Sequence, residues 1–130
     1  MVEKKLRFLR IYLIITLAFG VIGISDSTLS LFDASSIIYS IIIGLLAFLF
    51  FFFNIFALVH LMQDKLEKIT WILPTYHLLS AVLITIFGVL MALQGLLTNN
   101  VIFSLGIFGV LSSTFEIVFS LYLLKRFELF

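Results

Sequence analysis

The sequence predicts an all-α, polytopic membrane protein, built as a bundle of four transmembrane helices with both termini in the cytoplasm. Three observations predict this fold class. Hydrophobic residues make up 63% of the 130 residues and charged residues 12%, whereas typical soluble domains contain about 45–50% and about 25%. Four apolar stretches have roughly the 20 residues that a helix needs to cross a hydrocarbon core of about 30 Å. All basic residues lie on one side of the resulting arrangement.

The composition excludes several classes of protein. A small domain leaves much of its surface in water, so a soluble fold of this length could not bury so many apolar side chains. With a mean hydropathy of +1.30, the chain is not expected to be a soluble globular protein, a disordered segment or a nucleic-acid binder. It contains no cysteine, which excludes disulfides and thiolate metal sites. The common nucleotide-binding, zinc-protease and hydrolase motifs are also absent from the sequence.

The four predicted spans belong to a single domain over residues 1–130 and cover about residues 8–24, 36–62, 71–97 and 101–124. The first of them is the shortest. Polar segments at residues 25–35, 63–68 and 98–100 form the predicted loops between them. The last loop has three residues, which is short enough to make the third and fourth helices antiparallel neighbours.

Two signals mark the predicted helix starts. Asp33, Ser35 or Ser36 is placed to cap the second helix, because short polar side chains accept hydrogen bonds from the first free N–H groups. Pro74 is the single proline and falls in the first turn of the third span. A missing N–H costs little there, so this proline indicates a helix start rather than a kink.

The positions of the basic residues predict the orientation. They precede the first span, fill the second loop and follow the fourth span, and they are Lys4, Lys5, Arg7, Arg10, Lys65, Lys68, Lys125 and Arg126. Because basic residues near helix ends resist translocation, both termini and the middle loop should be cytoplasmic. A basic start before an apolar run is also typical of a secretory signal peptide. We interpret the first segment instead as a retained membrane anchor.

Each predicted span carries a stripe of small or polar residues on one face. Helices in a bilayer associate through such residues, because these allow the backbones to approach closely. The stripes, in chain order, consist of Thr16, Gly20 and Gly23; Ser40, Gly44, Ala47 and Asn54; Ala81, Gly88 and Gly95; and Gly106, Gly109, Ser113, Glu116 and Ser120. We expect these faces to pack into a left-handed bundle with crossing angles of roughly +20°.

Glu116 is the residue that most needs an explanation. It lies nine positions before Lys125, which places it about 12 Å inside the cytoplasmic edge of the membrane. An ionisable side chain at such depth is costly and usually faces the bundle interior or a cavity. Asn54 and His77 lie at nearly the same depth, about 12 and 10 Å from their own helix ends.

These residues predict an ion-binding or substrate-binding site in the inner half of the bundle. In this hypothesis Glu116 and His77 form a pair that exchanges a proton or a cation. Three shallower residues on the cytoplasmic side could complete the site: Tyr12, His60 and Tyr76. The alternative is that Glu116, His77 and Asn54 only join helices by hydrogen bonds, each worth about 0.6 kcal/mol in a membrane.

No cofactor is expected. His60 and His77 flank the middle loop on adjacent helices, so ligation of a haem by both imidazoles is geometrically conceivable. Their estimated depths differ by around 7 Å, however, and the flanking residues carry no cofactor signature. Two histidines and scattered acids are also too few for a metal cluster.

Two functions from different classes remain. The first is an oligomeric transporter or channel for a small ion or solute, with a path assembled between protomers because four short helices enclose little volume. The second is a non-catalytic accessory subunit that packs its small-residue and Phe-rich faces against a larger membrane complex. A lipid-modifying enzyme is a third reading, but no catalytic residue stands out. The expected partners are therefore the lipid bilayer and either further copies of the chain or a larger complex.

Overall fold

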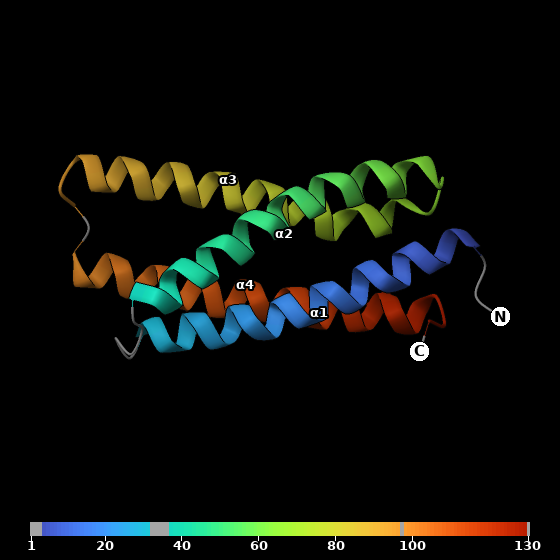
Figure 1. The fold of residues 1–130 in the computed structure, drawn as a ribbon, viewed down its shortest axis with the longest axis horizontal. Coiled ribbons are helices and arrows are strands. Elements are labelled where there is room, and N and C mark those ends of the chain that lie inside the picture. Colours follow the sequence, from blue (N-terminus) through green and yellow to red (C-terminus); the bar gives the residue numbers. More distant parts are fainter. Residues whose placement is uncertain (1–3, 32–36, 97, 130) are drawn as a thin grey trace.

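The structure, a computed structural model, describes residues 4–31, 37–96 and 98–129. It is all-helical and consists of α1 (Lys4–Leu31), α2 (Ile37–Gln63), the short 3-10 helix η1 (Lys68–Trp71), α3 (Ile72–Leu93) and α4 (Asn99–Arg126) (Figure 1). Four segments, one around each α-helix, are long and apolar enough to cross a membrane. The predicted all-α class with four such helices is therefore confirmed.

The first helix is longer than predicted. α1 has 28 residues, as many as α4, whereas α3 with 22 is the shortest of the four. Residues 25–31, which we expected to begin the first loop, continue the helix. The Ser25 hydroxyl donates to the carbonyl of Val21, so its polar group is satisfied inside the helix. The predicted caps Asp33, Ser35 and Ser36 lie outside the described residues.

The third helix ends earlier than predicted. Gly95 has a φ of 65°, a left-handed conformation that glycine adopts without steric cost. The backbone N–H of Leu96 donates to the carbonyl of Met91, and that of Gly95 to Ala92. This pair of bonds is the Schellman motif that closes a helix C-terminus. α3 therefore stops at Leu93 rather than near residue 97. Pro74 is the third residue of α3, so it lies in the first turn, as expected.

The four helices run alternately up and down (Figure 1). The start of α1, the end of α4 and the connection from α2 to α3 lie together at one end, which we call the basic end because it carries all eight Lys and Arg residues. At the opposite end, which we call the far end, lie the end of α1, the start of α2, the end of α3 and the start of α4.

The closest contact between helices joins α1 to α4 along most of their length. At four glycines an added Cβ atom would collide with the facing helix, and the pairs are Gly20 with Ile117, Gly23 with Ser113, Ser27 with Gly109, and Leu31 with Gly106. The residue numbers rise on one helix as they fall on the other, so the helices are antiparallel. We call this contact the α1–α4 seam. It contains the first and fourth of the predicted small-residue stripes.

The other two stripes do not form such contacts within the chain. A Cβ atom added at Gly44, Gly88 or Gly95 would meet no atom within 4 Å. Gly88 and Gly95 therefore do not pack against another of the described helices of this chain, and their role in helix packing stays a prediction. α3 packs mainly on α2 and makes few contacts with α4, and Gly95 serves the turn that follows α3. α3 and α4 run antiparallel (Figure 1) and are joined by the Tyr76–Ser112 and His77–Glu116 hydrogen bonds, although they make few other contacts.

The hydrophobic core is confined to the basic end. Five leucines from all four α-helices, each no more than 1% exposed, pack together in it: Leu9, Leu13, Leu61, Leu73 and Leu123. We call this group the leucine core. In α2, α3 and α4 every buried residue lies in the half toward the basic end. All four helices thus pack together at the basic end, whereas toward the far end the close contact is the one between α1 and α4.

The α1–α4 seam predicts that two glycine substitutions differ in their effect on stability. Gly23→Ile should lower the free energy of unfolding by about 1–3 kcal/mol, the usual cost of overpacking, because Ser113 occupies the space beside Gly23. Gly44→Ile is the matched control and should change stability little. Denaturation in mild detergent, followed by the fluorescence of the single tryptophan, Trp71, measures both. Equal stability of the two variants would contradict the seam.

Candidate functional site

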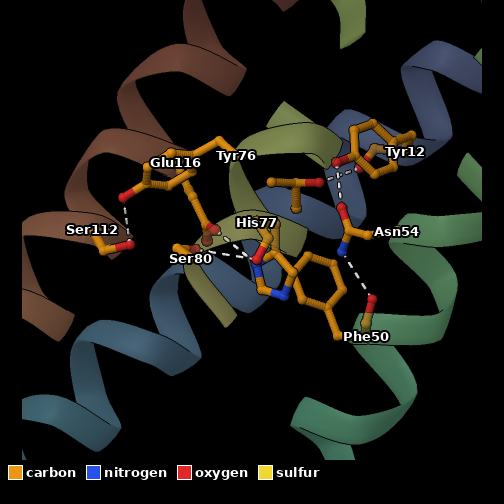
Figure 2. Close-up of polar contacts among 9 residues, drawn as sticks. Tyr12, Phe50, Asn54, Tyr76, His77, Ser80, Ser112 and Glu116 are labelled. Carbon is orange, nitrogen blue, oxygen red and sulfur yellow. Dashed lines mark hydrogen bonds and ion pairs between the residues drawn. The ribbon is translucent and has the colours of Figure 1, made fainter. Parts of the chain in front are cut away.

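One polar residue from each α-helix meets its neighbours in the middle of the bundle (Figure 2). These residues are Tyr12 of α1, Asn54 of α2, His77 of α3 and Glu116 of α4, and we call them the polar layer. Two hydrogen bonds join them into two pairs, Tyr12 with Asn54 and His77 with Glu116. One bond joins α1 to α2, and the other joins α3 to α4.

The His77–Glu116 pair is the part of the layer with acid–base chemistry. Nδ1 of His77 lies 2.9 Å from Oε1 of Glu116, so one proton can bridge the two atoms. A neutral imidazole donates from Nδ1 to the carboxylate, and a protonated imidazole does so as one half of an ion pair. The side chains keep 22% and 10% of their surface exposed. The pair is therefore not sealed inside the protein.

The Tyr12–Asn54 pair is closed. The Tyr12 hydroxyl donates to Oδ1 of Asn54 at 2.6 Å, and the Asn54 amide donates to the carbonyl of Phe50 at 2.8 Å. Asn54 is fully buried and Tyr12 is 1% exposed. The polar groups of both side chains are thus used inside the chain, which is the arrangement expected of an interhelical hydrogen bond.

Phe50 lies between the two pairs. Its carbonyl accepts the bond from Asn54, and its ring packs edge-on against the ring of His77, with the centroids 4.5 Å apart. On another side the ring stacks on Phe19 of α1 at 4.2 Å. Phe50 holds the imidazole of His77 in place by this contact. In the sequence Phe50 differs from the other phenylalanines of its run only in preceding Asn54 by one helical turn.

A cavity of about 290 Å³ begins at the polar layer and extends toward the far end. All four α-helices line it. The lining residues nearest the basic end are Phe19, Phe50, His77 and Glu116, and we call them the cavity floor. The wall nearest the end of α1 includes Asp26. Below the floor lies the leucine core, so the His77–Glu116 pair stands between a hollow half and a closed half of the bundle.

Three hydroxyl groups at or beside the cavity are bonded within the chain. Ser80 donates to the carbonyl of His77 at 3.1 Å, and the Tyr76 hydroxyl lies 2.8 Å from Oγ of Ser112. The second bond links α3 to α4 beside the cavity (Figure 2). These contacts leave the carboxylates of Glu116 and Asp26 as the charged groups of the cavity wall among the described residues.

The structure brings together most of the residues that the sequence singled out. Glu116 and His77 are bonded, and Phe50 contacts both His77 and Asn54, which is bonded to Tyr12. Tyr76 directly precedes His77 in α3, and its hydroxyl bonds to Ser112 of α4 instead. His60 is separate from this group. Its ring packs on Phe8 with the centroids 4.0 Å apart, and its Nε2 lies 3.5 Å from a carboxylate oxygen of Asp64.

The two histidines therefore have different partners. His60 lies against α1 and the end of α2, whereas His77 lies at the cavity floor. Across the part of the chain that the structure describes, no group of three or more His, Asp or Glu side chains is arranged to hold a metal ion.

Asp26 is the residue of the site that the sequence reasoning missed. It was assigned to the first loop because four polar residues follow one another there. A signal for its true place was available. Thr16, Gly20 and Gly23 are followed at the same helical spacing by Ser27, which packs against Gly109 in the seam. The stripe of small residues thus continues past Asp26, and so does the helix.

Comparison with known proteins leaves the function to be inferred from this site. No protein-family model, curated protein or solved structure matches the chain. A four-helix architecture alone does not indicate an activity, because one fold hosts many functions.

Proposed function

We propose that this chain is a multi-pass membrane protein that transports or conducts a small ion or solute, with Glu116 and His77 at the centre of its binding site. One observation carries the proposal: the His77–Glu116 hydrogen bond forms part of the floor of a cavity lined by all four α-helices. Ionisable residues at membrane depth are costly, and they commonly mark the paths of ions and substrates.

The contrast between the two pairs of the polar layer supports this function over a purely structural one. If both pairs only joined helices, both should be sealed from the cavity. The Tyr12–Asn54 pair is sealed, since its side chains are almost completely buried. The His77–Glu116 pair faces the cavity and keeps part of its surface exposed. An acid that only held helices together would gain nothing from such a position.

The closed basic end favours a transporter over an open channel. Leucine side chains fill the bundle between the cavity floor and the basic end, so a solute in the cavity has no polar route onward in this conformation. Transport therefore requires a second conformation in which the basic end opens, as in alternating access. The cavity lies within one chain, so a second copy is not required to form it.

The basic end is the cytoplasmic end in this proposal. Eight Lys and Arg residues lie there and none at the far end, which is the distribution expected of cytoplasmic helix ends. The outer faces of the helices carry many exposed large apolar side chains, and these would contact lipid. The cavity then belongs to the half of the bundle that faces away from the cytoplasm.

The transport function predicts a specific loss on Glu116→Gln. With the protein in liposomes, a panel of small cations, anions and neutral solutes should include at least one that drives measurable flux or current. Glu116→Gln should reduce that signal about tenfold or more, since loss of one charged contact costs about 1.4 kcal/mol or more. Glu67→Gln is the matched control, because Glu67 is exposed and pairs with Arg126 at the basic end.

Wild-type flux in a folded Glu116→Gln variant would contradict the proposal. Circular dichroism and the elution volume of the purified variant establish that it is folded.

The orientation is tested by thiol labelling, since the chain has no cysteine. Lys68→Cys places one thiol at the basic end and Asn100→Cys places one at the far end, both at exposed positions. A membrane-impermeant maleimide should label Asn100→Cys in intact cells and Lys68→Cys only after permeabilisation. Labelling of both in intact cells, or the reverse pattern, would contradict the proposed orientation.

An accessory subunit of a larger complex is the second candidate. The observation in its favour is that Gly44 and Gly88 lie against open space on α2 and α3, where close approach of a partner helix is sterically allowed. A groove between these helices is lined in part by Ala47, Ala81 and Thr85. This candidate predicts co-purification with a larger complex and no effect of Glu116→Gln.

A further inference from the structure

The charge of the cavity wall restricts the ligand that it can hold. Asp26 and Glu116 both line the cavity, whereas none of its described lining residues is Lys or Arg. The single basic side chain there, His77, is already bonded to Glu116. No hydrogen bond or ion pair links the Asp26 carboxylate to the other described residues. In a low-dielectric cavity such a wall attracts a cation and repels an anion.

The α1–α4 seam sets the separation of the two acids. Gly23 of α1 faces Ser113 of α4. Asp26 lies three residues beyond Gly23 toward the far end, and Glu116 lies three residues beyond Ser113 toward the basic end. At 1.5 Å of rise per residue, their levels along the bundle differ by about 9 Å. Glu116 therefore marks the floor of the cavity, and Asp26 lies higher on its wall.

The rest of the wall is apolar and aromatic. Phe19, Phe50 and Phe108 line the cavity together with aliphatic side chains. Aromatic rings attract cations through their faces and also pack against alkyl groups. A hard inorganic cation instead needs several oxygen ligands around it, whereas most of the residues that line the cavity are apolar. The volume of about 290 Å³ lies near the lower limit of small-molecule sites.

We propose that the cavity binds a small organic monocation, with its charge attracted by Glu116 and Asp26 and its alkyl groups packed against the phenylalanines. The inference rests on the proposed function, because it names the class of solute that the transport site would accept. It assigns a role to Asp26, which the hydrogen bonds of the fold do not use.

The experiment measures binding to the purified full chain in uncharged detergent by titration calorimetry. The probe is choline, and the control ligand is 3,3-dimethylbutan-1-ol, which has nearly the same shape without the charge. Potassium chloride keeps the ionic strength constant in both titrations. Choline should bind at least about tenfold more tightly than the alcohol, since the difference is one charged contact.

Two acidic residues and one control separate the site from the rest of the molecule. Glu116→Gln should weaken choline binding about tenfold or more, and Asp26→Asn about threefold to tenfold. Glu67→Gln should leave it unchanged. If Glu116→Gln does not fold, the choline affinity of Asp26→Asn still tests the site. This variant should fold, because no hydrogen bond or ion pair among the described residues involves the Asp26 carboxylate.

The outcomes distinguish the inference from the function on which it rests. Equal binding of choline and the alcohol, no binding of choline, or choline binding that neither acidic substitution weakens would overturn the cation site. If a neutral or anionic solute then still drives Glu116-dependent flux in liposomes, the transport function stands without the cation site. If no solute drives such flux, the transport function and the cation site are both overturned.

Discussion

The close approach of α1 and α4 is the constraint on which the rest of the structure depends. Gly20, Gly23, Gly106 and Gly109 leave no room for a side chain between the two helices, so the backbones meet and fix the register of one helix against the other. That register buries Glu116 beside the seam and places Asp26 about two helical turns above it. A glycine stripe thus determines the depth of both carboxylates of the cavity.

The remaining helices are packed more loosely, and this difference creates the cavity. α2 and α3 pack on each other but contact the α1–α4 pair less extensively. At the basic end leucines from all four α-helices fill the space between them. Toward the far end α1 and α4 stay in contact, but among the described residues no comparable set of buried side chains joins all four helices. The polar layer lies at the boundary, where His77 and Glu116 can be bonded to each other and still face the hollow half.

Much of this arrangement could be predicted from the sequence. Hydropathy and length are local properties, so they gave the four helices, and the charge distribution gave the common end of the basic residues. Counting residues from the helix ends placed Asn54, His77 and Glu116 at one level, because an α-helix has a fixed rise. Their pairing depends on helix rotation as well as on depth, so the sequence alone did not distinguish the sealed Tyr12–Asn54 pair from the exposed His77–Glu116 pair.

The sequence-based expectations that differ from the structure have a common physical origin. Small residues indicate that a close approach is sterically allowed, but they do not indicate which helix approaches. Gly88 and Gly95 therefore had the same signature as Gly106 and Gly109, although only the latter two lie in a helix contact. Asp26 was assigned to a loop because local polarity was weighed above periodicity. In a membrane helix a polar cluster is tolerated where it lines a cavity.

The central claim is that the bundle is hollow above the polar layer and closed below it. Three single-cysteine variants in α2 test this most directly: Leu46→Cys in the cavity wall, Leu45→Cys on the exposed outer face and Ala57→Cys in the hydrophobic core of the basic end. Thiol reagents attack the thiolate, which forms in water and not in an apolar environment. With the protein in lipid, a small water-soluble methanethiosulfonate should modify Leu46→Cys and spare the other two. Modification of Ala57→Cys, or protection of Leu46→Cys, would contradict the account.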